Sequence, residues 1–100
     1  MKPFFVYMLR CVDGSYYIGQ TDDLEKRLTE HTDGVRHGYT SKRLPVVLAH
    51  SEEFATRDEA NLREHQLKRW SRAKKEALIQ QKWERLKGLS RPKSRPAIRD

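Results

Sequence analysis

Short apolar segments near the N-terminus are separated by turn-forming residues, and apolar residues at helical spacing follow them. The segments 4–11 and 15–19 are rich in aromatic and branched side chains and flank the pair Asp13-Gly14. This is a hairpin signal. Pro45 is expected to start a third strand, 46–54. The pattern therefore predicts three strands, of which the first two form a hairpin.

The length of the hairpin loop decides which side chains share a face of the sheet. A two-residue loop would leave Tyr7 and Tyr17 on opposite faces, because a shift of one residue flips every side chain. A three-residue loop, 12–14, with Gly14 left-handed, would pair Leu9 with Tyr17. Both tyrosines would then be diagonal neighbours on one face, roughly 7–8 Å apart. If the two tyrosines cooperate, the three-residue loop is required.

A helix is expected to follow the hairpin, with Thr21 as its cap and the Asp-Gly pair 33–34 at its end. Two leucines four residues apart form its buried stripe. Arg27 and His31 have the same spacing, so their side chains should project together from a neighbouring stripe. The polar stretch that continues to Arg43 is expected to be a mobile loop.

Two further helices are expected in the second half of the chain. Thr56 and Glu59 fit a capping box, and Ser71 can cap the last helix. With 100 residues and 36% hydrophobic content, the chain can build one small core. Residues 1–87 are therefore expected to form one domain, and the basic, Pro- and Ser-containing segment 88–100 a disordered tail.

Glu64 occupies an unusual position in the helix that follows Thr56. It lies in line with Ala60 and Leu67, which should face inward. A half-buried carboxylate is costly unless it is paired or binds a metal. From the spacing alone, either a surface pair with Lys68 or His65, or a metal site, accounts for Glu64.

Positive charge is concentrated in the second half of the chain. The net charge of +7 divides into −1 for residues 1–55 and +8 for residues 56–100. The positive electrostatic field of such a basic segment favours binding to a polyanion. The candidates for contacts with a nucleic-acid backbone are Lys42, Arg43, Lys74 and Lys75.

The single cysteine and the lack of a long apolar run indicate where in the cell the protein is expected. Cys11 alone excludes an intrachain disulfide and fits a reducing compartment. No apolar run approaches the roughly 20 residues that span a bilayer. The chain is therefore expected to be soluble and cytoplasmic, with no membrane partner.

The motifs Phe5-Val6-Tyr7, Tyr17-Ile18-Gly19-Gln20-Thr21, Leu-x-x-Arg-Leu-x-x-His and Glu-x-x-Leu-Lys occur in one order. Together they resemble the GIY-YIG nuclease superfamily, and more closely its small single-domain bacterial branch, which is related to the nuclease module of the excision-repair incision subunit. The first motif departs from the family name at two strand-shaping positions. The resemblance implies an α+β fold with a three-stranded antiparallel sheet flanked by helices, in the order β-β-α-β-α-α, and an active site on one face of the sheet.

The resemblance also implies roles for individual residues. Catalytic roles fall to Tyr7, Tyr17, Arg27, His31 and Glu64, with Glu64 as the ligand of a divalent metal. Mg²⁺, or alternatively Mn²⁺, needs only one or two carboxylates. Tyr7 would be the general base, its pKa lowered by nearby cations, and His31 would support it or replace it. Arg27 would contact phosphate oxygens and Tyr17 would position the water or phosphate.

The predicted function is that of a metal-dependent endonuclease acting on DNA, with RNA as the alternative substrate. Structure-selective cleavage, linked to repair or recombination, is expected, and a protein partner would supply further specificity. The competing hypothesis is a non-catalytic nucleic-acid-binding module on the same fold.

Overall fold

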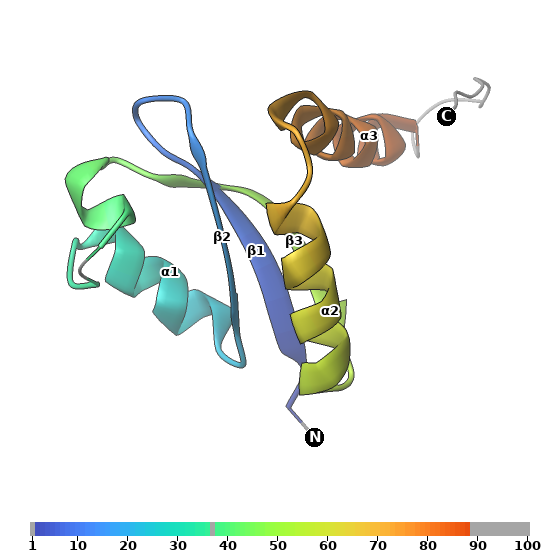
Figure 1. Cartoon of the computed structure of the whole chain (residues 1–100), viewed down its shortest axis with the longest axis horizontal. Coiled ribbons are helices and arrows are strands. Elements are labelled where there is room, and N and C mark those ends of the chain that lie inside the picture. The colour runs from blue at the N-terminus through green and yellow to red at the C-terminus, as the bar shows by residue number, and fades with distance from the viewer. Residues whose placement is uncertain (1, 37, 89–100) are drawn as a thin grey trace. The chain divides into compact units, whose positions relative to one another are not determined.

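The structure is a computed structural model that describes residues 2–36 and 38–88, with side chains to residue 81. The chain divides into two compact units, Met1–Arg69 and Trp70–Asp100. The first unit holds the sheet with helices α1 and α2, and the second holds α3 (Figure 1). The predicted tail lies outside the described residues except for Gly88, and the predicted domain boundary at residue 87 stays a prediction.

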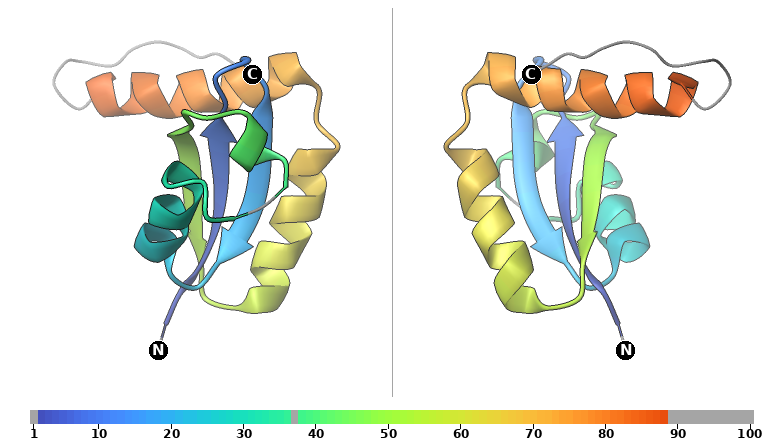
Figure 2. Two further views of the ribbon diagram at one scale, coloured as in Figure 1. Left: turned by 90° about the vertical axis from the view of Figure 1, so that its left-hand side faces the viewer. Right: turned by 90° about the vertical axis from the view of Figure 1, so that its right-hand side faces the viewer.

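The first unit is built on a three-stranded antiparallel sheet. β1 (Phe4–Arg10) lies between β2 (Tyr16–Thr21) and β3 (Val47–Phe54), and Figure 2 shows the strands side by side. The centre of β1 is buried on both faces, which suits its branched, aromatic and apolar side chains. The predicted α+β fold and its element order β-β-α-β-α-α are confirmed.

The β1–β2 loop has three residues, as the cooperation of the tyrosines requires. Tyr7 pairs with Gly19 and Leu9 pairs with Tyr17. Gly14 has a φ of 86° and its N–H donates to the Cys11 carbonyl at 2.9 Å. Because side chains alternate along a strand, Tyr7 and Tyr17 lie on the same face of the sheet.

Helix α1 (Leu24–Thr32) begins later than predicted. Its cap is Asp23, whose Oδ1 accepts the Lys26 N–H at 3.1 Å. The predicted cap, Thr21, was wrong because Thr21 is the last residue of β2, and its hydroxyl oxygen accepts the Asp23 N–H at 3.0 Å. The end was predicted correctly, since Gly34 follows the helix with a φ of 73°.

The two helices of this unit lie on opposite sides of the sheet (Figure 1). On the α1 side, Tyr7 and Leu9 form a core cluster with Cys11 and Val46, against which the predicted leucine stripe of α1 packs. Helix α2 (Arg57–Lys68) begins with the predicted capping box of Thr56 and Glu59 and contacts all three strands. The residues that fill the α2 side are Val6, Met8, Ile18, Ala60 and Leu67, all buried.

The segment between α1 and β3 is not a structureless loop. It contains a 3-10 turn, η1 (Thr40–Lys42), which begins with a buried threonine. The expectation of an irregular loop to Arg43 was wrong at this turn, because the Thr40 side chain is held inside the fold by His31, whereas the mobility of the stretch stays a prediction. The third strand then begins at Val47, one residue later than predicted.

The second unit contains helix α3 (Arg72–Gly88). The predicted cap is confirmed, because Ser71 Oγ accepts the Lys74 N–H at 3.2 Å. The Lys74 ammonium lies 4.4 Å from the centre of the Trp70 ring. Within the described residues, no helix has both the length and the apolar character needed to cross a bilayer.

An ion-pair network joins α2 to β3. Glu52 accepts two hydrogen bonds from the Arg63 guanidinium, at 2.8 and 2.9 Å, and lies 2.7 Å from the Nε2 of the buried His50. The contacts with His50 and Arg63 outweigh burial and lower the pKa of Glu52 from 4.5 to about 2.

This network makes stability depend on acidity. Because the folded-state pKa of Glu52 is lowered, its stabilisation is present above pH 4.5 and is lost as the pH falls toward 2. The full contribution is on the order of 3 kcal/mol. Urea unfolding between neutral pH and about pH 3 should therefore show a steeper loss of stability in the wild type than in Glu52→Gln. The exposed Glu53→Gln should keep the wild-type slope, and parallel curves for wild type and Glu52→Gln would contradict the assignment.

Candidate functional site

The centre of the site is a contact between β1 and α1. His31 Nε2 lies 3.0 Å from the Tyr7 hydroxyl, and both side chains are buried. The ring centres are 5.7 Å apart with an edge-on arrangement. His31 and Tyr7 are thus directly hydrogen-bonded, as the predicted support of Tyr7 by His31 requires.

Tyr17 lies beside this pair and is half-buried. Its ring centre is 6.3 Å from that of Tyr7 and 5.3 Å from that of His31. On the solvent side, Tyr17 stacks on the exposed Tyr39 at 6.1 Å. The Arg43 guanidinium lies 3.8 Å from the centre of the Tyr39 ring. An aromatic stack therefore leads from the surface to the buried Tyr7 hydroxyl.

Arg27 completes what we call the tyrosine site, formed by Tyr7, Tyr17, Arg27 and His31. Its Nη1 donates to the Gln20 carbonyl at 3.3 Å, and its Nε lies 3.3 Å from Glu30 Oε1. The side chain is 27% exposed, so one part of the guanidinium faces solvent. Arg27 thus brings a positive charge to the rim of the tyrosine site.

Burial controls the protonation of the tyrosine site. The pKa of Tyr7 is raised by desolvation, which outweighs the hydrogen bond and charge of Arg27. The predicted lowering of this pKa was wrong for the free protein, because the phenol is only 1% exposed. The pKa of His31 is lowered, first by desolvation and then by the charges of Arg36 and Arg27. At neutral pH the pair therefore consists of a phenol and a neutral imidazole.

Gly19 makes the approach of the tyrosines possible. A Cβ on Gly19 would lie 2.6 Å from the Tyr7 hydroxyl oxygen, 2.8 Å from Tyr7 Cζ and 3.2 Å from Tyr17 Cε2. Both tyrosine rings therefore lie across the bare backbone of β2, which only glycine allows.

Gly19→Ala should destabilise the protein by about 1–3 kcal/mol, because Tyr7 is buried and has little room to move. The measurement is urea unfolding. The same substitution in a Tyr7→Phe background should cost less, because the closest contact is with the hydroxyl oxygen. An equal cost in both backgrounds would mean that the hydroxyl contact is not the cause.

Glu64 is joined to the tyrosine site through one residue of the edge strand β2. Gln20 Nε2 donates to Glu64 Oε1 at 2.8 Å and also contacts Asn61 Oδ1. The Gln20 carbonyl accepts from Arg27. The Glu64 side chain is 13% exposed, and its other oxygen pairs with Lys68 at 2.8 Å. Glu64 is thus half-buried and ion-paired at the same time.

The structure therefore brings four of the five predicted catalytic residues together and places the fifth at a neighbouring position. Tyr7, Tyr17, Arg27 and His31 gather on the α1 side. Glu64 belongs to α2, and its contact is with the side chain of Gln20, which points away from the α1 face because of strand alternation. Glu64 consequently lies at the β2 edge and not among the tyrosines.

The four predicted contacts for a nucleic acid differ in their surroundings. Lys42 is exposed on η1, next to the tyrosine site. Arg43 is engaged within the fold, since its Nε pairs with Asp13 at 3.0 Å and its Nη1 donates to the Tyr39 carbonyl at 2.9 Å. Lys74 and Lys75 belong to the second unit.

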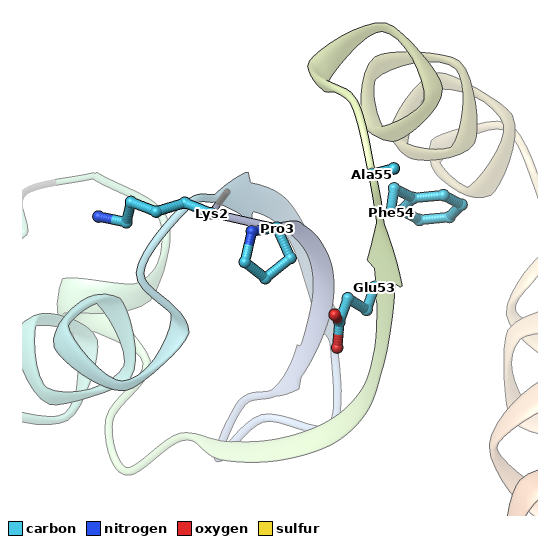
Figure 3. Close-up of a pocket in the computed structure, with 5 residues that line it drawn as sticks. All are labelled: Lys2, Pro3, Glu53, Phe54 and Ala55. Atoms are coloured by element: carbon cyan, nitrogen blue, oxygen red, sulfur yellow. The ribbon is translucent and has the colours of Figure 1, made fainter.

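A hollow elsewhere in the first unit lies where β1 begins and β3 ends. Its lining consists of Lys2, Pro3, Glu53, Phe54 and Ala55 (Figure 3). No residue of the tyrosine site takes part in this lining, so the hollow is separate from the candidate chemistry.

Sequence reasoning missed three residues that hold the predicted ones. Gln20 and Asn61 surround Glu64, and Thr40 holds His31. Gln20 belongs to the second tyrosine motif, which is a signal that could have been used. Asn61 precedes Glu64 by three residues, close to one helical turn, and this spacing also predicts a shared face. Thr40 carried no comparable signal.

Comparison with known sequences decides the family. The sequence profile of the GIY-YIG catalytic domain matches residues 3–77. The chain belongs to the GIY-YIG family. The GIY-YIG domain defines a nuclease family.

Relatives of this GIY-YIG protein span most of its described length. A UPF0213 protein of Halobacterium salinarum is 48% identical over 74 residues, which is 74% of this chain and 96% of the relative. A UPF0213 protein of Bacillus pumilus is 46% identical over 77 residues, 77% of this chain and 79% of the relative. The solution NMR structure of a UPF0213 protein from Bacillus halodurans is similar with a TM-score of 0.55 and 36% identity, covering 90% of this chain and 99% of that one. None of these three names states a reaction.

Proposed function

We propose that this protein is a metal-dependent endonuclease that hydrolyses phosphodiester bonds in DNA. The observation that carries the proposal is the position of Gln20, whose backbone contacts Arg27 and whose side chain contacts Glu64. A phosphate-binding arginine and a metal-binding carboxylate are thereby held on either side of one strand. The buried Tyr7–His31 pair lies next to them.

The residues around Glu64 fit a hard divalent cation. Gln20 Nε2 donates to both the Glu64 carboxylate and the Asn61 amide oxygen, and Gln20 Oε1 is buried without a hydrogen-bond partner among the described residues. No group of three His, Cys, Asp or Glu side chains gathers anywhere in the described part of the chain. Mg²⁺ suits such a site, because it takes one or two carboxylates, keeps several waters and completes its shell with phosphate.

Binding of a cation by Glu64 would require Lys68 to move away. The Lys68 side chain is 53% exposed, so its ion pair is screened by water and contributes little to stability. When bound, the metal would neutralise charge on the phosphate and on the leaving oxygen. Glu64 is the residue that would hold it, with the Asn61 amide oxygen as a further ligand.

The tyrosine site would supply the remaining chemistry. Arg27 would exchange its contact with Glu30 for the phosphate oxygens of the substrate, which its planar guanidinium matches. Tyr7, paired with His31, would accept the proton of the attacking water. Its hydroxyl is buried in the free protein, so the side chains above it must shift when substrate binds, as is common for sites that tighten only in the complex. Tyr17 would position the water or the phosphate.

Positive charge supports a nucleic acid as the substrate. The net charge of +7 favours a polyanion, and the exposed Lys42 lies next to the tyrosine site. Lysine contacts with phosphates position a strand but carry no sequence information. We therefore expect the protein to select DNA by its structure, as in repair or recombination, and to gain further specificity from a protein partner.

The direct test is a cleavage assay with the purified full chain. Single-stranded, duplex, flapped and branched DNA, and the same forms of RNA, are incubated with Mg²⁺, Mn²⁺ or EDTA. Cleavage of DNA that EDTA abolishes supports the proposal. Preferential cleavage of RNA would change the substrate, and tight binding without cleavage of any form would leave a non-catalytic binding module.

A further inference from the structure

The histidine of the tyrosine site has a second partner. Thr40 begins the η1 turn and is 2% exposed, and its Oγ1 lies 2.8 Å from His31 Nδ1. Since Nε2 of the same ring contacts the Tyr7 hydroxyl at 3.0 Å, both ring nitrogens are engaged inside the fold. The hydrogen-bond chain Tyr7–His31–Thr40 thus links β1, α1 and η1.

The direction of this chain follows from the donors that must be satisfied. Tyr7 and Thr40 both carry buried hydroxyls, and each lies within hydrogen-bond distance of one His31 ring nitrogen. A neutral imidazole can accept from only one of them, and the phenol, which is far more acidic than an aliphatic alcohol, is the stronger donor. Among the described residues, His31 Nε2 is the acceptor within reach of the Tyr7 hydroxyl. Nε2 must then carry a lone pair, and a neutral imidazole has only one proton. That proton is therefore on Nδ1, where it is donated to Thr40 Oγ1.

We propose that Thr40 is a positioning residue that holds His31 in the Nδ1-protonated tautomer, so that Nε2 can accept the proton of Tyr7. The proposal rests on the proposed nuclease function. In the transfer, the Tyr7 O–H bond breaks and an Nε2–H bond forms, which leaves a tyrosinate and an imidazolium. Both N–H groups of the imidazolium are then paired, one with Tyr7 and one with Thr40.

The fold fixes the position of Thr40 through the hairpin loop. The Arg43 N–H donates to the Thr40 carbonyl at 3.0 Å, and the Arg43 carbonyl accepts from the Val12 N–H at 3.0 Å. The Arg43 guanidinium binds Asp13 in the same loop and covers the Tyr39 ring. Arg43 thus fastens η1 to the β1–β2 loop and, through η1, holds Thr40 against His31.

A hydroxyl partner differs from the carboxylate that often orients a histidine. A carboxylate accepts from the ring N–H and also stabilises the imidazolium by its charge, whereas the Thr40 hydroxyl accepts from Nδ1–H without adding a charge. The Thr40 oxygen therefore orients the ring without making it a stronger base. His31 stays neutral in the free protein and is ready to accept a proton.

The test compares Thr40→Val, which removes the hydroxyl at similar volume, with Thr40→Ser, which keeps it. Nitrogen-15 NMR of the full chain labelled at histidine distinguishes protonated from unprotonated ring nitrogens. The signals of His31 are identified by their loss in His31→Gln. We expect Nδ1 to carry the proton in the wild type and in Thr40→Ser, and the Nε2-protonated form to gain population in Thr40→Val.

Cleavage provides the second measurement. We expect Thr40→Val to lower kcat roughly 10- to 100-fold, the usual cost of losing the partner that orients a functional histidine, with KM unchanged. Thr40→Ser should restore the rate. Thr29→Val makes the same chemical change on the exposed surface of α1 and should leave both the signals and the rate unchanged.

Two results would overturn the proposal: an Nε2-protonated ring in the wild type, or an unchanged tautomer in Thr40→Val. Should Thr40→Val fail to fold, the wild-type spectrum alone still decides the tautomer. The NMR result does not depend on cleavage. A wild type that cuts no substrate but shows the Nδ1-protonated ring would refute the nuclease function and leave the role of Thr40 in the tautomer intact.

Discussion

Glu64→Gln should reduce cleavage to a small residual rate while the fold survives. Glutamine has the same shape and keeps an oxygen near Gln20, but it lacks the negative charge that a divalent cation needs. Loss of the cation removes several kcal/mol of transition-state stabilisation, which corresponds to a rate about 1000-fold lower. Stability should change by less than about 1 kcal/mol, because the pair with Lys68 is partly exposed.

The matched control is Glu53→Gln, the same chemical change at an exposed position of β3. It should cleave at the wild-type rate. Isothermal titration with Mn²⁺ then tells whether the rate falls because the metal no longer binds or because the substitution disturbs the site in another way. Weaker binding of Mn²⁺ by Glu64→Gln than by the wild type supports a metal site at Glu64. A Glu64→Gln variant that cleaves at the wild-type rate would falsify the assignment of Glu64 as the metal ligand.

The hairpin shows how much a local pattern can determine. An Asp-Gly pair allowed a two-residue or a three-residue loop, and the need for both tyrosines on one face selected the longer one, which the structure confirms. The capping box at Thr56 and the end of α1 at Gly34 were predictable for the same reason. In each case the interacting atoms lie within a few residues of one another.

Contacts between distant segments were not predictable in this way. Thr40 lies in a polar stretch without periodicity, and its burial depends on the packing of η1 against His31. The start of α1 was misplaced because Thr21 is also needed by β2, where it pairs with Phe5. Thr21 could serve either element, and its pairing in the strand was hard to foresee because the partner strand is not adjacent in the sequence.

The position of Glu64 illustrates a limit of helix-face arguments. Its alignment with Ala60 and Leu67 correctly indicated partial burial, and Lys68 proved to be its ion-pair partner as well. The alignment could not tell which face of the sheet α2 would cover. That choice places Glu64 beside Gln20 and explains why an amide links the carboxylate to the tyrosine site.

The protonation of Tyr7 could not be predicted from charge alone. Nearby cations were expected to lower its pKa, and Arg27 and Arg36 do act in that direction. The ring, however, is part of the core cluster with Leu9, and the loss of hydration outweighs both charges. In a small domain one side chain can serve both the core and the site, and burial then sets its chemistry.

Tyr7→Phe should reduce cleavage by about 1000-fold, within the range that a general base contributes. Phenylalanine keeps the ring in the core and removes only the oxygen bonded to His31. His31 Nε2 then loses its partner, which should cost about 1–2 kcal/mol of stability in urea unfolding. We expect the wild-type rate to rise as the pH rises through the lowered pKa of His31, because only the neutral imidazole can take the Tyr7 proton, and the residual rate of Tyr7→Phe to lack this rise.

Two further variants distinguish the roles of the tyrosines. Tyr17→Phe should reduce the rate by a smaller factor and keep the increase with pH, since Tyr17 would position the substrate and not take the proton. Tyr16→Phe, on the opposite face of β2, is the control for the loss of a strand hydroxyl and should cleave normally. If Tyr17→Phe instead removes the pH dependence and Tyr7→Phe preserves it, the half-buried Tyr17 is the base, and the Tyr7–His31 contact serves only to hold α1 against the sheet.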